Sequence, residues 1–232
     1  MNHWQDNLLG IGIYSVPEAA RLTHISPWRI RRWLSGYSFI STGSRHSSSP
    51  VWSGDIPRID GTTALSFRDL LEIRIIDSFL KAGVSWKTIR RAEQLGSEFL
   101  NTSHPFSTNR IHTDGRAIFA EVNKYKHEKA LIDLIRSQRV FQTFINPFLK
   151  SLTFSNDGNP LQWWPYQDSQ HIVIDPHRSF GQPITYKEGV PTQILASAFK
   201  TFDSIDKVAN WYDVEPIGVE ESVEYEKILV AA

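Results

Sequence analysis

Two helix starts follow each other closely in Tyr14-Ser-Val-Pro-Glu-Ala-Ala-Arg-Leu-Thr-His-Ile-Ser-Pro-Trp-Arg-Ile-Arg-Arg-Trp-Leu34. Each starts with a serine that can cap a helix, Ser15 or Ser26, and has a proline in its first turn. The spacing predicts a short helix, a tight connection of about four residues and a second helix that Gly36 ends. Two short helices joined in this way are typical of a helix-turn-helix.

The second helix is expected to have two different faces. The apolar residues that should face the core are Ile30, Trp33 and Leu34. Trp28, Arg31 and Arg32 then project from the opposite face, with Arg29 at its edge. Guanidinium groups suit phosphate and guanine because they are always charged and donate in a planar fork. The N-terminal part of the second helix enters the major groove in this motif, so these residues are predicted to contact DNA.

The segment from Phe39 to Gly61 is rich in Ser, Gly and Pro and predicts a loop or a two-stranded wing. It carries Arg45 and His46 among serines, and such side chains contact phosphates. The predicted DNA-binding residues are therefore Trp28, Arg29, Arg31, Arg32, Arg45 and His46. Two amphipathic helices are expected after this segment, at about 66–82 and 86–100.

Composition excludes several classes of protein. The chain has 232 residues, of which 41% are hydrophobic and 22% charged, so it is not disordered throughout. No apolar stretch approaches the roughly 20 residues that span a bilayer, and the first residues lack the layout of a signal peptide. Cysteine is absent, which excludes disulfides, thiol nucleophiles and thiolate metal sites. We expect a cytoplasmic protein.

Charge is distributed unevenly along the chain. Residues 1–140 hold 19 Lys+Arg and 13 Asp+Glu, a balance of +6, whereas residues 141–232 hold 6 and 12, a balance of −6. This asymmetry suggests that the first part faces a polyanion and the second part another partner. The alternative is two domains that merely differ in surface charge. The acidic residues near the C-terminus are expected to form a solvated face or to meet a basic partner: Asp213, Glu215, Glu220, Glu221, Glu224 and Glu226.

The remaining segments predict smaller elements. Asp114-Gly115 between two short apolar runs predicts a hairpin within 106–122. A helix or mixed segment is expected at about 127–140, and 141–168 is expected to be irregular and aromatic. The last third is expected to contain one strand and then three helices, at 172–174, 192–200, 204–212 and 219–229. Three helices in so short a segment indicate a compact small domain.

No enzyme signature is present. The sequence lacks Gly-x-Gly-x-x-Gly, a Walker-type phosphate loop and a Gly-x-Ser-x-Gly elbow, so we predict no catalytic residue and no cofactor. His171, Asp175 and His177 form the single close cluster of potential metal ligands. Turn formation explains these residues better than a metal, so no metal site is predicted.

The first hundred residues resemble a known family. The stretch from Tyr14 to Leu34 resembles the opening of MerR-type winged helix-turn-helix domains. Leu65-Ser-Phe-Arg-Asp-Leu-Leu71 and Ala82-Gly-Val-Ser-Trp-Lys-Thr-Ile-Arg-Arg91 resemble the helix pair that follows the wing in those domains. The resemblance implies a DNA-binding head.

The far end resembles the small domain of VapB-type antitoxins that carry a MerR-like head. The motifs are Ile174-Asp-Pro176, Gly181-Gln-Pro183 and Gly189-Val-Pro-Thr192. The family pattern reads Gly-x-Pro and then Gly-Thr-Arg-Ile-Pro-Val, and Lys187-Glu-Gly189 stands here where Gly-Thr-Arg is expected. The resemblance implies an antitoxin that represses its own operon and neutralises a PIN-type ribonuclease toxin.

Together these patterns predict a mainly α protein with small β wings and hairpins. We expect a MerR-like winged helix-turn-helix domain at 8–100, a hairpin and helix connector at 101–168, and a small three-helix, helix-turn-helix-like domain at 169–232. The expected function is a non-enzymatic antitoxin and autorepressor. Its expected partners are double-stranded promoter DNA and a cognate ribonuclease toxin, without a membrane. A homodimer is expected because helix-turn-helix proteins usually read two symmetric half-sites.

Two alternatives remain open from the sequence. The first is a stand-alone MerR-like transcription regulator whose C-terminal region binds a ligand or partner through aromatic residues: Phe148, Trp163, Trp164 and Tyr166. The second is a metal-dependent enzyme that uses His171, Asp175 and His177.

Overall fold

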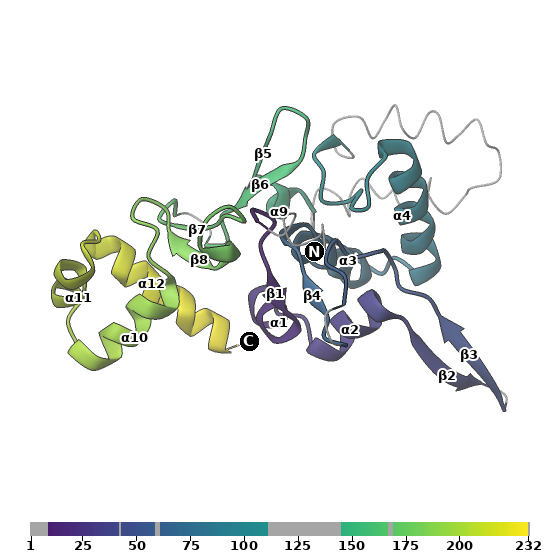
Figure 1. The fold of residues 1–232 in the computed structure, drawn as a ribbon, viewed down its shortest axis with the longest axis horizontal. Coiled ribbons are helices and arrows are strands. Elements are labelled where there is room, and N and C mark those ends of the chain that lie inside the picture. The colour runs from purple at the N-terminus through teal and green to yellow at the C-terminus, as the bar shows by residue number, and fades with distance from the viewer. Residues whose placement is uncertain (1–8, 42, 59–60, 111–144, 167–168, 232) are drawn as a thin grey trace, which may run out of the picture.

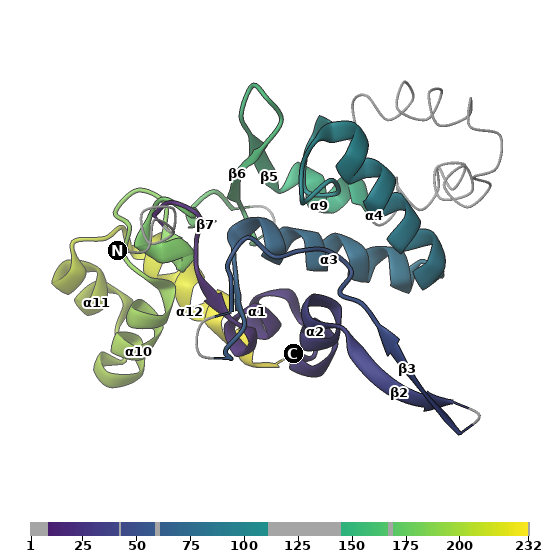
Figure 2. The same ribbon diagram turned by 45° about the vertical axis from the view of Figure 1, so that its right-hand side comes forward.

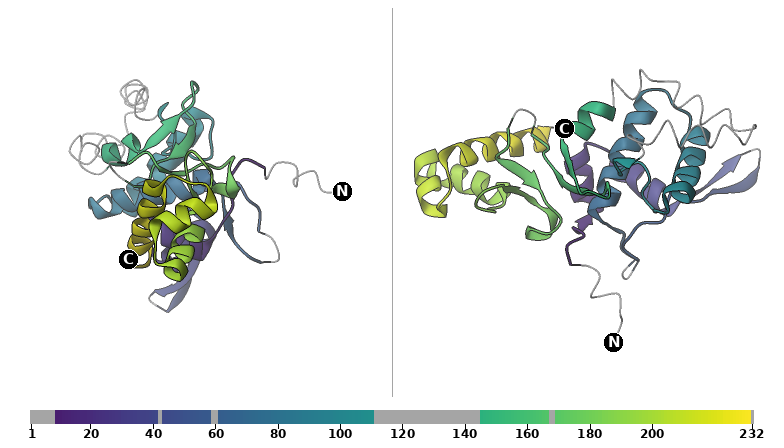
Figure 3. Two further views of the ribbon diagram at one scale, coloured as in Figure 1. Left: turned by 90° about the vertical axis from the view of Figure 1, so that its left-hand side faces the viewer. Right: turned by 90° about the horizontal axis from the view of Figure 1, so that it is seen from above.

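The computed structural model describes residues 9–41, 43–58, 61–110, 145–166 and 169–231. This part of the chain is mainly helical and contains three small antiparallel sheets, which confirms the expected fold class at that level. The molecule is elongated, with three helices at one end and a β-hairpin that projects at the other (Figures 1 and 3). No helix in the described ranges is both long and apolar enough to cross a membrane.

The first two helices form as their capping residues predict. Helix α1 spans Val16–Thr23 and α2 spans Pro27–Ser35. The hydroxyl of Ser15 accepts a hydrogen bond from the third residue of α1, and Ser26 does the same for α2, which satisfies amide groups that a helix leaves free at its start. Between the helices His24 adopts a left-handed conformation (φ 57°), which turns the chain.

A β-hairpin follows α2. Strands β2 (Tyr37–Ser41) and β3 (Ser44–Ser48) pair antiparallel, so the segment predicted as a loop or a two-stranded wing contains a two-stranded hairpin. Gly36 connects α2 to the hairpin at a φ of 68°. A Cβ at this position would collide with the carbonyl of Ser48, so glycine is required both for its conformation and for the close approach of the two chains.

Two longer helices form the centre of the N-terminal part, residues 9–110, which we call the head. Helix α3 spans Phe67–Lys81 and α4 spans Trp86–Leu100, close to the predicted bounds. Helix α3 crosses over α1 and α2 (Figure 2) and is buried on most of its surface. The two-residue strands β1 (Tyr14–Ser15) and β4 (Ala64–Leu65) pair beside its start. The main apolar core therefore surrounds α3, and the buried side of α2 packs against this core.

The predicted hairpin within 106–122 lies almost entirely outside the described residues, and the predicted helix at 127–140 lies wholly outside them. The chain is described again from a short helix, α9 (Asn146–Lys150), onwards. A four-stranded antiparallel sheet of order β5-β6-β7-β8 follows. Its strands are Leu152–Phe154, Pro160–Trp163, Ile172–Ile174 and Pro183–Thr185. Two of these strands precede residue 168 and two follow it, so the domain boundary predicted at this residue falls within one sheet.

The expectation that 141–168 is irregular is wrong for its described part. Strands β5 and β6 form a hairpin around Asp157-Gly158, and Gly158 has a φ of 83°. The amide of Ser155 donates to the carbonyl of Asn159 at 2.9 Å, which closes this turn. An Asp-Gly pair is a strong hairpin signal, but the flanking strands are too short to show a clear alternation. The strand predicted at 172–174 is confirmed.

The C-terminal helices are α10 (Thr192–Phe202), α11 (Ile205–Tyr212) and α12 (Pro216–Ala231), as predicted in number and order. They share a small core that includes Leu195, Val208 and Val219. Helix α12 also reaches the head, because Tyr225 and Leu229 belong to the main core. Its last turns lie beside α1 (Figure 1).

Candidate nucleic-acid interface

Helix α2 separates its side chains as its sequence predicts. Ile30 and Trp33 are 0% and 5% exposed and pack in the main core. On the other side Trp28 is 62% exposed and Arg31 is also exposed. Trp28 and Arg31 therefore lie on the surface side of α2, as predicted.

Arg29 is tied to the body of the protein. Its guanidinium lies 2.8 Å from the Asp77 carboxylate on α3 and 4.9 Å from the Trp33 ring centroid. Asp77 is 5% exposed in its side chain and also pairs with Lys81 at 2.9 Å. Arg29 was predicted at the edge of the outward face, and the structure gives it an internal partner that neutralises part of its charge.

Arg32 is held between two aromatic rings. Its guanidinium carbon lies 4.3 Å from the Trp28 ring centroid and 3.4 Å from that of Tyr37. Trp28 belongs to α2 and Tyr37 begins the hairpin, so this stack fixes the hairpin against the helix. Cation–π contacts of this kind position a guanidinium while leaving its edge free to donate hydrogen bonds.

The two predicted wing residues lie on opposite faces of the hairpin. Phe39 pairs with His46 across the strands, and Ile40 pairs with Arg45. Successive side chains in a strand point to opposite faces, so the stacked pair Phe39–His46, with centroids 5.4 Å apart, shares a face with Tyr37. Both Arg45 and His46 are exposed. His46 thus continues the aromatic row that starts at Trp28, and Arg45 does not.

Helix α4 anchors the base of the hairpin through Arg90. Its guanidinium donates to the carbonyl of Pro50 at 3.0 Å, to the hydroxyl of Ser48 at 2.9 Å and to the carbonyl of Ser49 at 2.6 Å. A groove of about 280 Å³ lies between α2, the hairpin and α4, and Arg90 lines it together with Arg32. Sequence reasoning placed Arg90 on the helix but missed this contact.

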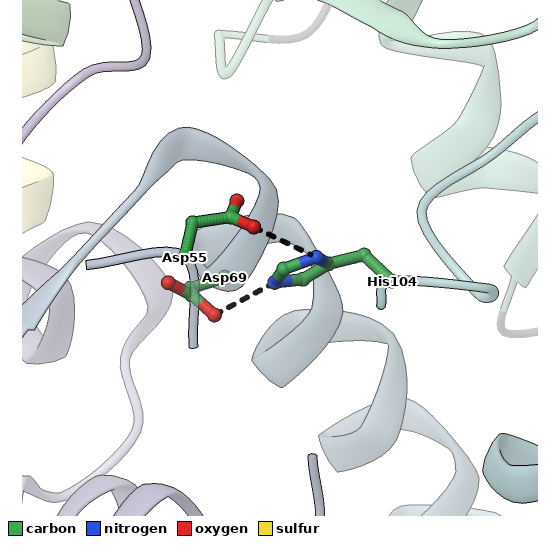
Figure 4. Close-up of side chains that lie close together, drawn as sticks. All are labelled: Asp55, Asp69 and His104. Carbon is green, nitrogen blue, oxygen red and sulfur yellow. Dashed lines mark hydrogen bonds and ion pairs between the residues drawn. The ribbon is translucent and has the colours of Figure 1, made fainter. Parts of the chain in front are cut away.

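A polar cluster of Asp55, Asp69 and His104, in which only Asp55 is exposed, lies at the loop that follows the hairpin (Figure 4). The imidazole of His104 lies between two carboxylates. Its Nε2 is 2.7 Å from Oδ1 of Asp69, and its Nδ1 is 3.6 Å from Oδ1 of Asp55 and 2.9 Å from the hydroxyl of Ser103. His104 and Asp69 are both 0% exposed. Sequence reasoning missed this cluster because its members are far apart in the chain.

The pKa shifts of His104 and Asp69 favour their charged forms. Burial alone would lower the pKa of His104, but the hydrogen bond and charge of Asp69, with the charge of Glu72, hold it above its usual value. Burial alone would raise the pKa of Asp69, but hydrogen bonds from His104 and Trp52 hold it below its usual value. These shifts favour imidazolium beside carboxylate, which is the arrangement that compensates burial of both groups.

Asp55, Asp69 and His104 form the one group, among the described residues, whose ligand atoms lie close enough to share a metal ion, all within 4.8 Å of one another. The oxygens of Asp69 already accept from the indole of Trp52 at 2.7 Å and from the amide of Ser66 at 2.9 Å. These donors, with His104 itself, already occupy most of the acceptor positions of Asp69. The geometry favours a structural network that joins the loop after the hairpin to α3 and to the loop after α4.

Glu72 lies next to this cluster and is fully buried. Its carboxyl group accepts hydrogen bonds from the amides of Phe106 at 3.2 Å and Ser107 at 2.9 Å. Burial raises the pKa of Glu72 to about 7, although the charge of His104 opposes this shift. The group therefore titrates near neutral pH.

In the described structure neither set of residues on which the two alternatives depend comes together as a whole. His171 contacts Glu221 at 3.1 Å, whereas His177 contacts Asp175 at 3.4 Å, and His171, Asp175 and His177 form no shared ligand group in the described structure. The four aromatic residues are divided between two places. Phe148 and Trp163 are buried and pack edge to face at 5.8 Å, and Trp164 and Tyr166 line a surface hollow.

The acidic residues near the C-terminus do not all lie on one solvated face, because Glu226 is buried and pairs with Arg21. Glu221 is half-buried and contacts His171. The other four are exposed, although Glu215 pairs with Lys187: Asp213, Glu215, Glu220 and Glu224.

Comparisons with known proteins give two similarities over almost the whole chain. No family model matches the sequence. A Mycobacterium tuberculosis protein named "Putative antitoxin VapB45" is 24% identical over 223 residues, which cover 89% of this chain and 90% of that protein. The crystal structure of Rv2018 from Mycobacterium tuberculosis superposes with a TM-score of 0.69 at 20% identity, and the match covers 93% of this chain and 99% of that one. The second similarity shows that the two chains share a fold.

Proposed function

We propose that this chain is the antitoxin of a type II toxin–antitoxin pair, that it binds its own promoter DNA as an autorepressor, and that it neutralises a PIN-type ribonuclease toxin. The similarity to the protein named as an antitoxin supports the general role. The MerR-like assignment of the head rests on the sequence resemblance together with the order of helix pair, hairpin and second helix pair. In this proposal the protein acts in the cytoplasm as a homodimer and catalyses no reaction.

One observation carries the DNA-binding part of the proposal. The Arg32 guanidinium between Trp28 and Tyr37 joins the outer side of α2 to the hairpin, so exposed basic and aromatic groups of both elements form one continuous face. Helix and wing contact adjacent parts of a duplex in winged helix-turn-helix proteins, and a fixed face of this kind matches that geometry. We assign Trp28, Arg31, Arg32 and His46 to DNA contact, and Arg29 to positioning α2 through Asp77. Arg45 lies on the opposite face of the hairpin, so its contact with DNA stays a prediction from the sequence.

The DNA-binding part is tested by titrating the full chain into a labelled duplex from upstream of its own gene, with a scrambled duplex of equal length as the control. Tighter binding to the upstream duplex at matched salt is expected. Equal binding to both duplexes would contradict autorepression, because promoter specificity is a ratio of affinities.

The toxin-binding part is tested by expressing the chain with the nuclease that is encoded beside it. Restored growth and co-purification of the two proteins are expected. A nuclease that stays toxic and does not co-purify would contradict this part. The stand-alone regulator is supported less well, because its four aromatic residues do not line one cavity.

A further inference from the structure

A second groove borders α2 next to the start of α1. It has a volume of about 460 Å³ and is bounded by the start of α1, the outer side of α2 and the loop on either side of residues 59–60. Three arginines line it: Arg31, Arg32 and Arg58. Nothing in the sequence pattern pointed to Arg58, which lies outside the helix pair and follows both strands of the hairpin.

The groove combines positive charge with hydroxyl donors. Ser35, Thr62 and Thr63 line it beside the three arginines, and no acidic side chain is among the described residues that form its wall. Glu18, the acid in the first turn of α1, accepts a hydrogen bond from the Ser15 amide at 2.7 Å and so caps its own helix. Guanidinium and hydroxyl groups together are the donor set that proteins use for phosphate oxygens.

The side chain of Arg58 is held in position by a hydrogen bond. Its guanidinium donates a hydrogen bond to the hydroxyl of Ser35, at the end of α2. An arginine has five N–H donors in a fixed plane, so this bond orients the group and leaves its other donors available. The exposed Arg31 on the neighbouring turn of α2 lines the same groove.

We propose that this groove binds a phosphodiester group of the DNA strand that flanks α2, with Arg58 and Arg31 as its charged contacts. This inference rests on the proposed DNA binding and adds a specific phosphate site to it. Free inorganic phosphate offers the same tetrahedral oxygens, so the test separates the two sources.

The test uses the full chain with Arg58→Ala, with Arg58→Lys, and with Lys207→Ala as a matched control that removes an exposed cation from α11. Affinity for the upstream and scrambled duplexes is measured over a series of salt concentrations. Arg58→Ala is expected to weaken binding to both duplexes alike and to reduce the slope of log K against log salt by about 0.9. If variant and wild type converge near 1 M salt, that slope corresponds to about an eight-fold loss near 0.1 M.

Arg58→Lys is expected to restore most of the slope, because it keeps the charge, and Lys207→Ala is expected to leave it unchanged. Equal melting temperatures of the three variants would show that they fold alike. If the wild type binds duplex DNA and Arg58→Ala matches Lys207→Ala, the phosphate site is wrong although the proposed function stands. If the wild type binds no duplex, the proposed function itself fails.

Inorganic phosphate is titrated in parallel, with the melting temperature as the readout. If the groove binds DNA phosphate, we expect inorganic phosphate to change the melting temperatures of wild type and Arg58→Ala by the same small amount. A stabilisation that Arg58→Ala abolishes, with an unchanged DNA salt slope, would show that the groove takes free phosphate and would overturn the DNA contact.

Discussion

Arg21 on α1 and Glu226 on α12 form an ion pair at 2.8 Å, although 205 residues separate them in the chain. The same carboxylate accepts a hydrogen bond from the Thr192 hydroxyl at 2.6 Å. Nearby, the Tyr14 hydroxyl donates to the Gly181 carbonyl at 2.8 Å. The C-terminal helices are thus bonded to the helix that packs directly against α2.

Glu226→Ala is expected to lower the free energy of unfolding by about 1–2 kcal/mol, because Arg21 and Thr192 lose a charged acceptor that is largely buried. Urea denaturation followed by tryptophan fluorescence measures the change. Glu224→Ala, an exposed acid on the same helix, is the control and should have little effect. Equal effects of the two variants would show that the bond between head and tail adds no stability.

The stability of the protein is expected to fall as pH rises through neutrality. Burial raises the pKa of Glu72 from 4.5 to about 7, so the folded state holds this proton more tightly and loses that advantage between these two values. The pKa of His104 is also raised, so its contribution is complete below about 6.5 and is lost as pH rises through its folded pKa. The depressed pKa of Asp69 acts at the acid end, where its contribution is lost as pH falls.

Denaturation at a series of pH values compares the wild type with Glu72→Gln, which keeps an oxygen to accept hydrogen bonds but does not titrate. The wild type is expected to lose more stability than the variant between about pH 4.5 and 7, the interval that separates the ordinary and folded pKa values of Glu72. Parallel stability curves would contradict the assignment to Glu72.

Arg29→Ala is expected to affect mainly the stability of the protein, and Arg31→Ala mainly its affinity for DNA. Arg29→Ala should lower the free energy of unfolding by about 1 kcal/mol, because Asp77 loses one of two cations at a partly exposed position. Arg31→Ala should leave stability unchanged and weaken promoter binding, through a salt slope reduced by about 0.9 for a phosphate contact or about 1–3 kcal/mol for a base contact. Melting curves and duplex titrations of both variants check this. A loss of stability in Arg31→Ala would contradict the position of that side chain on the solvent side of α2.

Residues 1–100 alone are expected to be much less stable than the full chain. Phe106 is 2% exposed and packs edge to face on Phe79 of α3 at 5.3 Å, and Ile145 and Tyr225 belong to the same core. A cut at residue 100 removes these partners and exposes apolar surface around α3. Thermal melting followed by circular dichroism compares the fragment with the full chain. A fragment that melts cooperatively at the same temperature would show that the head folds independently.

Features that depend on residues close together in the chain, such as helix starts, could be predicted from the sequence. Ser15, Ser26, Ser66 and Ser85 cap the four helices of the head through bonds within a few residues of each serine, so both the start and the existence of each helix could be predicted. The buried and exposed sides of α2 followed from the spacing of its apolar residues.

The pairings between distant segments were not predictable in this way. The partner of Arg29 lies on α3, and the partners of His104 lie 35 and 49 positions earlier in the chain. Nothing in the local pattern of either residue distinguishes a free side chain from a paired one. The division of labour among the three arginines of α2 depends on which neighbour each one meets after folding, and only the structure supplies those neighbours.

The stack of Trp28, Arg32 and Tyr37 has a consequence for the thermodynamics of recognition. An arginine that is loose on a surface loses roughly 2 kcal/mol of rotamer entropy when a ligand immobilises it. Arg32 is already confined between two rings, so much of that freedom is lost during folding and not during association. The hairpin can bend away from α2 only if the guanidinium slides out of the stack. A duplex that meets this face therefore has to adapt its own shape to a stiff surface.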